Sequence, residues 1–133
     1  MHIIVASDNK STRDAIAMLI RAQPDLELAG EAGDIADLLA KIKATESPLV
    51  ILDWDVLGQR IETLMDLLQL FDQPPSIVAL SVREAARQDA LSAGISRFAH
   101  KGEPPERLLA TIREAKGPRP TRSERHRHNG QPL

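Results

Sequence analysis

Leu49-Val50-Ile51-Leu52-Asp53 is the stretch of the chain that decides the fold. Four consecutive aliphatic residues predict a strand buried on both faces of a parallel sheet, because such a strand has no solvent side for polar residues. The run ends abruptly in a carboxylate. Ligands of open α/β sheets bind at the carboxyl ends of the strands, so Asp53 is predicted to lie at a functional site.

Four further segments are predicted to be strands, and helical patterns separate them. The strands are residues 2–6, 26–30, 76–81 and 96–100. We expect helices capped by Ser11 and by Asp34, a helix over residues 61–71, another over 84–93, and a last one that starts at Pro104-Pro105. This strict alternation predicts an α/β fold: a flavodoxin-like, doubly wound, five-stranded parallel sheet of order 2-1-3-4-5 with helices on both faces.

The length and composition favour one domain in a reducing compartment. The chain has 133 residues and no cysteine, so disulfides and thiolate metal sites are excluded. We expect one folded domain over residues 1–116 and a disordered basic tail over 117–133, which contains four arginines and one glutamate. No signal peptide or membrane span is apparent, and the expectation is a cytoplasmic protein without a membrane partner.

Four of the predicted strands bring a polar side chain to the same edge of the sheet. These residues are Asp8, Asp53, Ser81 and Lys101. Two carboxylates side by side repel each other unless a cation joins them, and Mg²⁺ prefers such oxygen ligands. A lysine and a hydroxyl facing that ion are suited to hold a phosphoryl group. The pattern therefore predicts a phosphoryl-binding site.

With these residues in place, the chain resembles the receiver domain of two-component response regulators. The resemblance covers residues 2–115 and includes Phe98, three residues before Lys101, and the segment from Lys101 to Leu108. The final helix is most similar to the subclass that carries a helix-turn-helix DNA-binding output domain after the receiver.

The resemblance implies a role for each residue of the site. Asp53 is implied to be the phosphoacceptor, which attacks the phosphohistidine of a sensor histidine kinase. Asp8, Asp53 and the backbone carbonyl of Asp55 are implied to hold Mg²⁺, and Lys101 to bind the phosphoryl oxygens.

A switch is implied as well. Ser81 is implied to move toward the aspartyl phosphate, with Phe98 turning inward behind it. A homodimer partner or a DNA-binding output domain would then sense the altered face. The chain is expected to act as a switch and not as an enzyme.

The chain departs from the family pattern near Asp53. Ser7 stands where the family usually has a second acid, which predicts weaker Mg²⁺ binding. Val82 stands where a very small residue is usual, which predicts a narrowed approach to Asp53 and slow phosphorylation by small donors. Equal labelling rates for the wild type and Val82→Ala would refute that prediction. Asp55 and Arg83 are expected to pair over the site and to slow the attack of water on the phosphate.

Two other functions remain open. The first is a receiver-like protein-interaction module with a degenerate acidic pocket, which docks partners without being phosphorylated. The second is a small flavodoxin-like binder of a nucleotide or cofactor. The second is disfavoured because no glycine-rich phosphate loop follows the first predicted strand.

Overall fold

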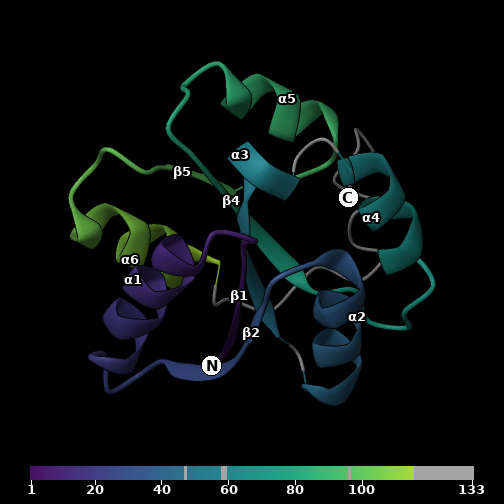
Figure 1. Cartoon of the computed structure of the whole chain (residues 1–133), viewed down its shortest axis with the longest axis horizontal. Helices are drawn as coiled ribbons and strands as arrows, with labels where there is room; N and C mark the ends of the chain where they lie inside the picture. The colour runs from purple at the N-terminus through teal and green to yellow at the C-terminus, as the bar shows by residue number, and fades with distance from the viewer. Residues whose placement is uncertain (47, 58–59, 96, 116–133) are drawn as a thin grey trace, which may run out of the picture.

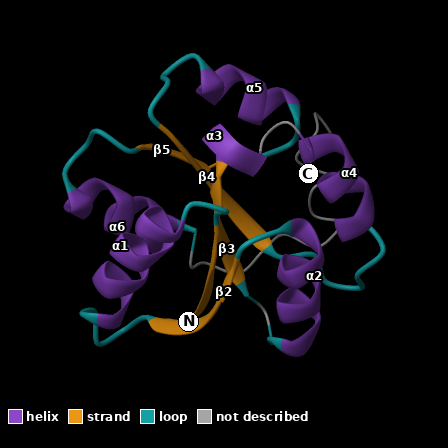
Figure 2. Ribbon diagram, in the orientation of Figure 1, coloured by secondary structure: helices purple, strands orange, loops and turns teal. Residues whose placement is uncertain are grey.

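The computed structural model describes residues 1–46, 48–57, 60–95 and 97–115. Its strands form one parallel sheet in the order β2-β1-β3-β4-β5 (Figure 2). Their bounds are β1 His2–Ala6, β2 Glu27–Ala32, β3 Leu49–Asp53, β4 Ser76–Ser81 and β5 Arg97–His100. The predicted fold class and strand order are confirmed. The predicted tail, residues 117–133, lies outside the described residues.

Helices cover both faces of the sheet (Figure 1). Their bounds are α1 Lys10–Arg21, α2 Ile35–Ala44, α3 Trp54–Leu57, α4 Ile61–Leu68, α5 Ala86–Ser92 and α6 Pro105–Glu114. Helices α1 and α6 pack on one face, and α2, α4 and α5 contribute to the apolar core on the other. No helix in the described part of the chain is both long and apolar enough to cross a membrane.

The central strand explains why the core has two layers. All five residues of β3 are buried. Leu49 and Ile51 pack in the core beneath α1 and α6, while Val50 and Leu52 pack in the core on the opposite face. Successive side chains of a strand point to opposite faces, so an uninterrupted aliphatic run serves both cores. Asp53, which is itself buried, ends the strand at the carboxyl edge of the sheet.

Several local features differ from the predictions. The four-residue helix α3 was not predicted, and α4 and α5 are shorter than the predicted ranges 61–71 and 84–93. Asn9, and not Ser11, caps α1: its side-chain oxygen accepts a hydrogen bond of 3.1 Å from the backbone N–H of Thr12. Strand β2 begins one residue later and ends two residues later than predicted. Its register with β1 shifts at Ala29, because Ile3 pairs with Leu28 and Ile4 pairs with Gly30. Such an extra residue is a bulge, which hydrophobic alternation does not reveal.

Candidate functional site

Asp53 is the buried centre of the site. It ends β3 with 1 % of its surface exposed. Its Oδ2 accepts a hydrogen bond of 2.6 Å from the hydroxyl of Ser7. Its Oδ1 accepts bonds of 2.8 Å from Nζ of Lys101 and 3.1 Å from the backbone N–H of Asp55. Both oxygens of the carboxylate therefore have donors within the protein, as a buried charge requires.

Ser7 is buried next to Asp53 and makes several hydrogen bonds. It follows β1, which pairs with β3, and it is fully buried. Its hydroxyl accepts from the backbone N–H of Asn9 at 3.1 Å while donating to Asp53. Its carbonyl accepts a bond of 2.7 Å from the guanidinium of Arg13. From the sequence, Ser7 was considered only as the loss of an acidic residue, and its hydrogen bond to Asp53 was not predicted. The pairing of β1 with β3, which brings the two residues together, was the available signal.

Lys101 joins two carboxylates. Its Nζ lies 2.8 Å from Oδ1 of Asp53 and 3.1 Å from Oδ2 of Asp55, and 21 % of the side chain is exposed. The backbone N–H of Lys101 donates to the carbonyl of Ser81 at 2.8 Å, which fixes the end of β5 beside β4. Burial by itself lowers the pKa of Lys101, but the hydrogen bonds to Asp53 and Asp55 outweigh it and the pKa is raised.

Asp55 contributes its side chain to the site. It lies in the first turn of α3, where its Oδ1 accepts a hydrogen bond from the hydroxyl of Ser81 and its Oδ2 accepts one of 2.9 Å from the backbone N–H of Val82. Burial raises the pKa of Asp55, but the bonds from Ser81, Val82 and Lys101 outweigh it, so its pKa lies below the usual value. Sequence reasoning assigned only the Asp55 backbone carbonyl and a pairing with Arg83.

The structure places the predicted tuning residues around this network. Nε of Arg83 lies 3.9 Å from Oδ1 of Asp55, and its backbone N–H donates to the hydroxyl of Ser81 at 3.0 Å. Val82 is 57 % exposed, and its backbone N–H is the group that contacts the site. Asp8 is exposed, and no hydrogen bond or ion pair joins it to another residue in the described ranges. Asp53, Ser81 and Lys101 are thus gathered by direct contacts, whereas Asp8 adjoins them only through Ser7.

The donor set suits Mg²⁺ shared with a phosphoryl group better than a cage made by the protein alone. The acids of the site, Asp8, Asp53 and Asp55, offer the oxygen ligands that Mg²⁺ prefers. Across the described ranges, no three His, Cys, Asp or Glu side chains are grouped so that they could hold a metal ion. Mg²⁺ commonly uses only one or two carboxylates and completes its shell with water and phosphate oxygens.

Phe98, the predicted switch residue, is buried, and the guanidinium of Arg87 lies over its ring. It lies on β5 with 8 % of its surface exposed. The guanidinium carbon of Arg87, on α5, is 4.6 Å from the centre of the ring, a cation–π distance. Nε of Arg87 is also 2.7 Å from the carboxylate of Glu84. Sequence reasoning did not find this contact, because it depends on how α5 crosses β5.

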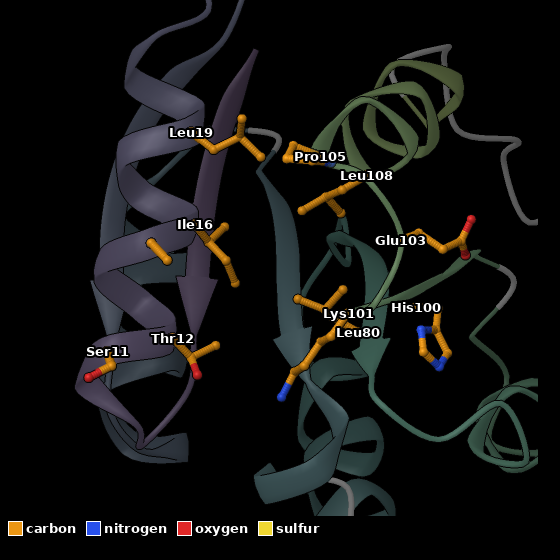
Figure 3. A pocket seen from close by; sticks show the side chains of 11 residues that line it. Ser11, Thr12, Ile16, Leu19, Leu80, His100, Lys101, Glu103, Pro105 and Leu108 are labelled. Carbon is orange, nitrogen blue, oxygen red and sulfur yellow. The ribbon is translucent and has the colours of Figure 1, made fainter.

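A groove of about 440 Å³ lies beside the site, between α1 and the segment that joins β5 to α6 (Figure 3). Apolar side chains from α1, β4 and α6 line it, among them Ile16, Leu19, Leu80 and Leu108. Lys101 lines one part of the same groove. A surface for apolar contact therefore adjoins the lysine that touches Asp53.

Curated relatives of the chain include bacterial transcriptional regulators. The chain is 29 % identical over 101 residues to the DNA-binding transcriptional activator DevR/DosR of Mycobacterium tuberculosis. This alignment covers 74 % of this chain and 46 % of that protein. It is 27 % identical over 118 residues to the uncharacterized transcriptional regulatory protein YxjL of Bacillus subtilis, covering 86 % of this chain and 54 % of that one. The chain spans about half the length of these relatives. No family model matches it.

Solved receiver domains share the fold. The isolated receiver domain of RcsB from Salmonella enterica aligns with a TM-score of 0.72 and 22 % identity over 87 % of this chain and 90 % of that one. RcsB bound to promoter DNA in the presence of the phosphomimetic BeF₃⁻ aligns with a TM-score of 0.72 and 19 % identity over 87 % of this chain and 61 % of that one. A complex between the phosphorylated P1 domain of CheA3 and CheY6 from R. sphaeroides aligns with a TM-score of 0.63 and 18 % identity over 85 % of this chain and 93 % of the matched chain.

Fold, site and relatives point to one class. The chain has the fold of solved response-regulator receiver domains and is similar in sequence to bacterial transcriptional regulators. The resemblance predicted from Asp53, Ser81, Phe98 and Lys101 is confirmed at this level, and the relatives point to regulators of transcription.

Proposed function

We propose that Asp53 accepts a phosphoryl group from the phosphohistidine of a sensor histidine kinase in a Mg²⁺-dependent reaction. The observation that carries the proposal is the 2.8 Å contact between Nζ of Lys101 and Oδ1 of Asp53, a buried carboxylate at the carboxyl end of the central strand. The phosphorylated P1 domain bound to CheY6 supports a kinase as partner, since that complex contains the same fold.

The reaction is a displacement at phosphorus. An oxygen of Asp53 forms the new P–O bond while the P–N bond to the kinase histidine breaks, and the released imidazole takes a proton from solvent. Lys101 offsets the negative charge that the phosphoryl oxygens bring to the site. Asp8, Asp53 and the backbone carbonyl of Asp55 are the residues proposed to hold Mg²⁺, which supplies further charge neutralisation.

The phosphorylated state would be sensed at a distance from Asp53. Ser81 ends β4 and Phe98 lies on the neighbouring β5, so a change in the position of Ser81 reaches the surface built by β4, α5 and β5. We place there the contact with a homodimer partner or with a DNA-binding output domain. The DNA-binding relatives, and the fact that the chain spans about half their length, support an output domain of that kind. The whole system is proposed to act in the cytoplasm.

Tryptophan fluorescence tests the proposal. Trp54, the single tryptophan of the chain, directly follows Asp53 and is buried. Titration with Mg²⁺ and then with BeF₃⁻ is expected to change Trp54 emission in a saturable way, and Asp53→Ala is expected to abolish the response to BeF₃⁻. An identical response in Asp53→Ala would contradict the assignment of Asp53 as phosphoacceptor.

One observation favours the alternative function, a phosphorylation-independent interaction module. The carboxylates of Asp53 and Asp55 are already satisfied by donors of the protein, and an apolar groove adjoins them. A module of this kind would dock its partner with Asp53→Asn as well as with the wild-type chain. Loss of regulatory output in Asp53→Asn, with the folded state intact, would exclude it.

A further inference from the structure

The carboxylate of Asp55 occupies a built oxyanion-binding site. Three donors from two segments converge on it. The end of β4 supplies the hydroxyl of Ser81 and the backbone N–H of Val82 at 2.9 Å, and the end of β5 supplies Nζ of Lys101 at 3.1 Å. The guanidinium of Arg83 stands 3.9 Å away. Ammonium, amide and hydroxyl donors arranged around one point bind carboxylates and phosphoryl oxygens alike.

This site directly adjoins the proposed phosphoacceptor. The same Nζ of Lys101 that contacts Asp55 also donates to Oδ1 of Asp53 at 2.8 Å, and the backbone N–H of Asp55 donates to that oxygen at 3.1 Å. A phosphoryl group on Asp53 brings three acceptor oxygens and about two negative charges into this space. It needs the donors that Asp55 now holds, and its charge repels the Asp55 carboxylate.

We propose that the Asp55 carboxylate is a built-in competitor for the phosphoryl group: it fills the oxyanion site formed by Ser81, the Val82 N–H and Lys101, and it must withdraw before a tetrahedral oxyanion can bind there. The proposal deepens the proposed function, on which it rests for the identity of the ligand. An internal anion has a high effective concentration at its site, so external anions bind more weakly than the donors alone would allow.

The position of Asp55 permits the withdrawal. Its side chain is 20 % exposed and belongs to the four-residue helix α3, so a rotation about its side-chain bonds carries the carboxylate into solvent. Asp53, in contrast, is almost completely enclosed. The Asp55 carboxylate can therefore move into solvent, whereas the Asp53 carboxylate stays buried at the end of β3.

The competitor also has a consequence for the switch. Because Asp55 holds the hydroxyl of Ser81, that side chain already points into the site without a phosphoryl group. Phe98 is buried behind the end of β4 in the same structure. On this proposal, phosphorylation exchanges one anion for another as the partner of the Ser81 hydroxyl.

One test does not depend on phosphorylation of Asp53. It uses inorganic sulfate, which forms no covalent bond to a carboxylate. The backbone N–H of Val82 is followed by nuclear magnetic resonance during sulfate titration of the wild type, Asp55→Ala and Asp55→Asn. The dissociation constant is expected to be at least about tenfold lower in both variants, because each loses the competing charge. Adding Lys101→Ala to Asp55→Ala is expected to remove the gain. Dissociation constants in the variants equal to the wild-type value would overturn the proposal.

Asp37→Asn is the matched control, because it removes a carboxylate that also pairs with a lysine, at 2.6 Å, but lies on α2 away from the site. It is expected to leave sulfate binding unchanged. Titration with BeF₃⁻ and Mg²⁺ then links the result to the acceptor: Asp55→Ala is expected to bind BeF₃⁻ at least about tenfold more tightly than the wild type, and Asp53→Ala not at all. If sulfate behaves as expected while BeF₃⁻ binding is independent of Asp53, the proposed function fails and the role of Asp55 stands.

Discussion

The hydroxyl of Ser7 donates a hydrogen bond of 2.6 Å to Oδ2 of Asp53, and both residues are buried. They are 46 residues apart in the chain and meet because β1 pairs with β3. At the position where the receiver family usually has an acid, this chain has a hydroxyl that donates to the Asp53 carboxylate. Ser7, Lys101 and the backbone N–H of Asp55 together supply the hydrogen-bond donors of the Asp53 carboxylate.

Ser7→Ala is expected to lower the free energy of unfolding by about 1–3 kcal/mol, the cost of leaving one oxygen of a buried carboxylate without its donor. Urea denaturation followed by Trp54 emission measures the change. Ser11→Ala is the control, because Ser11 is exposed on α1. A loss no larger than in Ser11→Ala would show that the Ser7 bond contributes nothing to stability.

Ser7→Asp is expected to make stability depend on Mg²⁺. The change places a second carboxylate against the buried Asp53, and two like charges that close repel strongly unless a cation lies between them. Without Mg²⁺ the variant should unfold at a lower urea concentration than the wild type, and added Mg²⁺ should restore much of the difference. Wild-type stability should respond less to Mg²⁺. An equal response in both proteins would contradict the idea that Ser7 replaces part of the metal's role.

Lys101→Met is expected to destabilise the protein by about 3–5 kcal/mol, because it leaves the buried Asp53 charge without its cation. Lys10→Met is the matched control: Lys10 also lies 2.8 Å from a carboxylate, that of Asp14, but its side chain is 78 % exposed. Exposed pairs contribute about 0–1 kcal/mol, so the control should change little. Similar losses of unfolding free energy in Lys101→Met and Lys10→Met would show that the burial of Asp53 does not cause the destabilisation.

The stability that Lys101 provides should also depend on pH. Its pKa is raised in the folded protein above the ordinary value of 10.5. A raised pKa means that the contribution is complete below 10.5 and is lost as the pH rises through the folded value. The difference in unfolding free energy between the wild type and Lys101→Met should therefore be constant near neutral pH and shrink in the alkaline range. A difference that stays constant there would contradict the raised pKa.

Arg87→Ala is expected to cost about 0.5–1 kcal/mol, the value of a partly exposed cation–π contact. The guanidinium lies 4.6 Å from the centre of the Phe98 ring. Glu84→Gln separates the two interactions of Arg87, since it weakens the ion pair of 2.7 Å and leaves the ring contact. A loss in Glu84→Gln as large as in Arg87→Ala would assign the effect to the ion pair.

The sequence predicted those parts of the molecule that depend on local patterns. The aliphatic run before Asp53 and the alternation of strands with helices predict the sheet order, and parallel strands bring the ends of β3, β4 and β5 to one edge. Asp53, Ser81 and Lys101 are therefore predictable as neighbours.

The remaining features depend on side-chain directions and on local backbone geometry. Whether the carboxylate of Asp55 enters the site is decided by the rotamer of its side chain, which no spacing in the sequence reports. The bond from Ser7 to Asp53 follows from the pairing of β1 with β3 and was missed because Ser7 was considered only as a charge. The bulge at Ala29 moved the end of β2, since hydrophobic alternation does not show an extra residue.

The measurement that tests the central claim most directly is the intact mass of the chain after incubation with Mg²⁺ and a small acyl phosphate donor. The wild type is expected to gain one phosphoryl group, Asp55→Ala to gain it faster, and Asp53→Asn to gain none. A phosphoryl group gained equally by Asp53→Asn, or none in the wild type and in Asp55→Ala alike, would contradict the assignment of Asp53 as the phosphoacceptor.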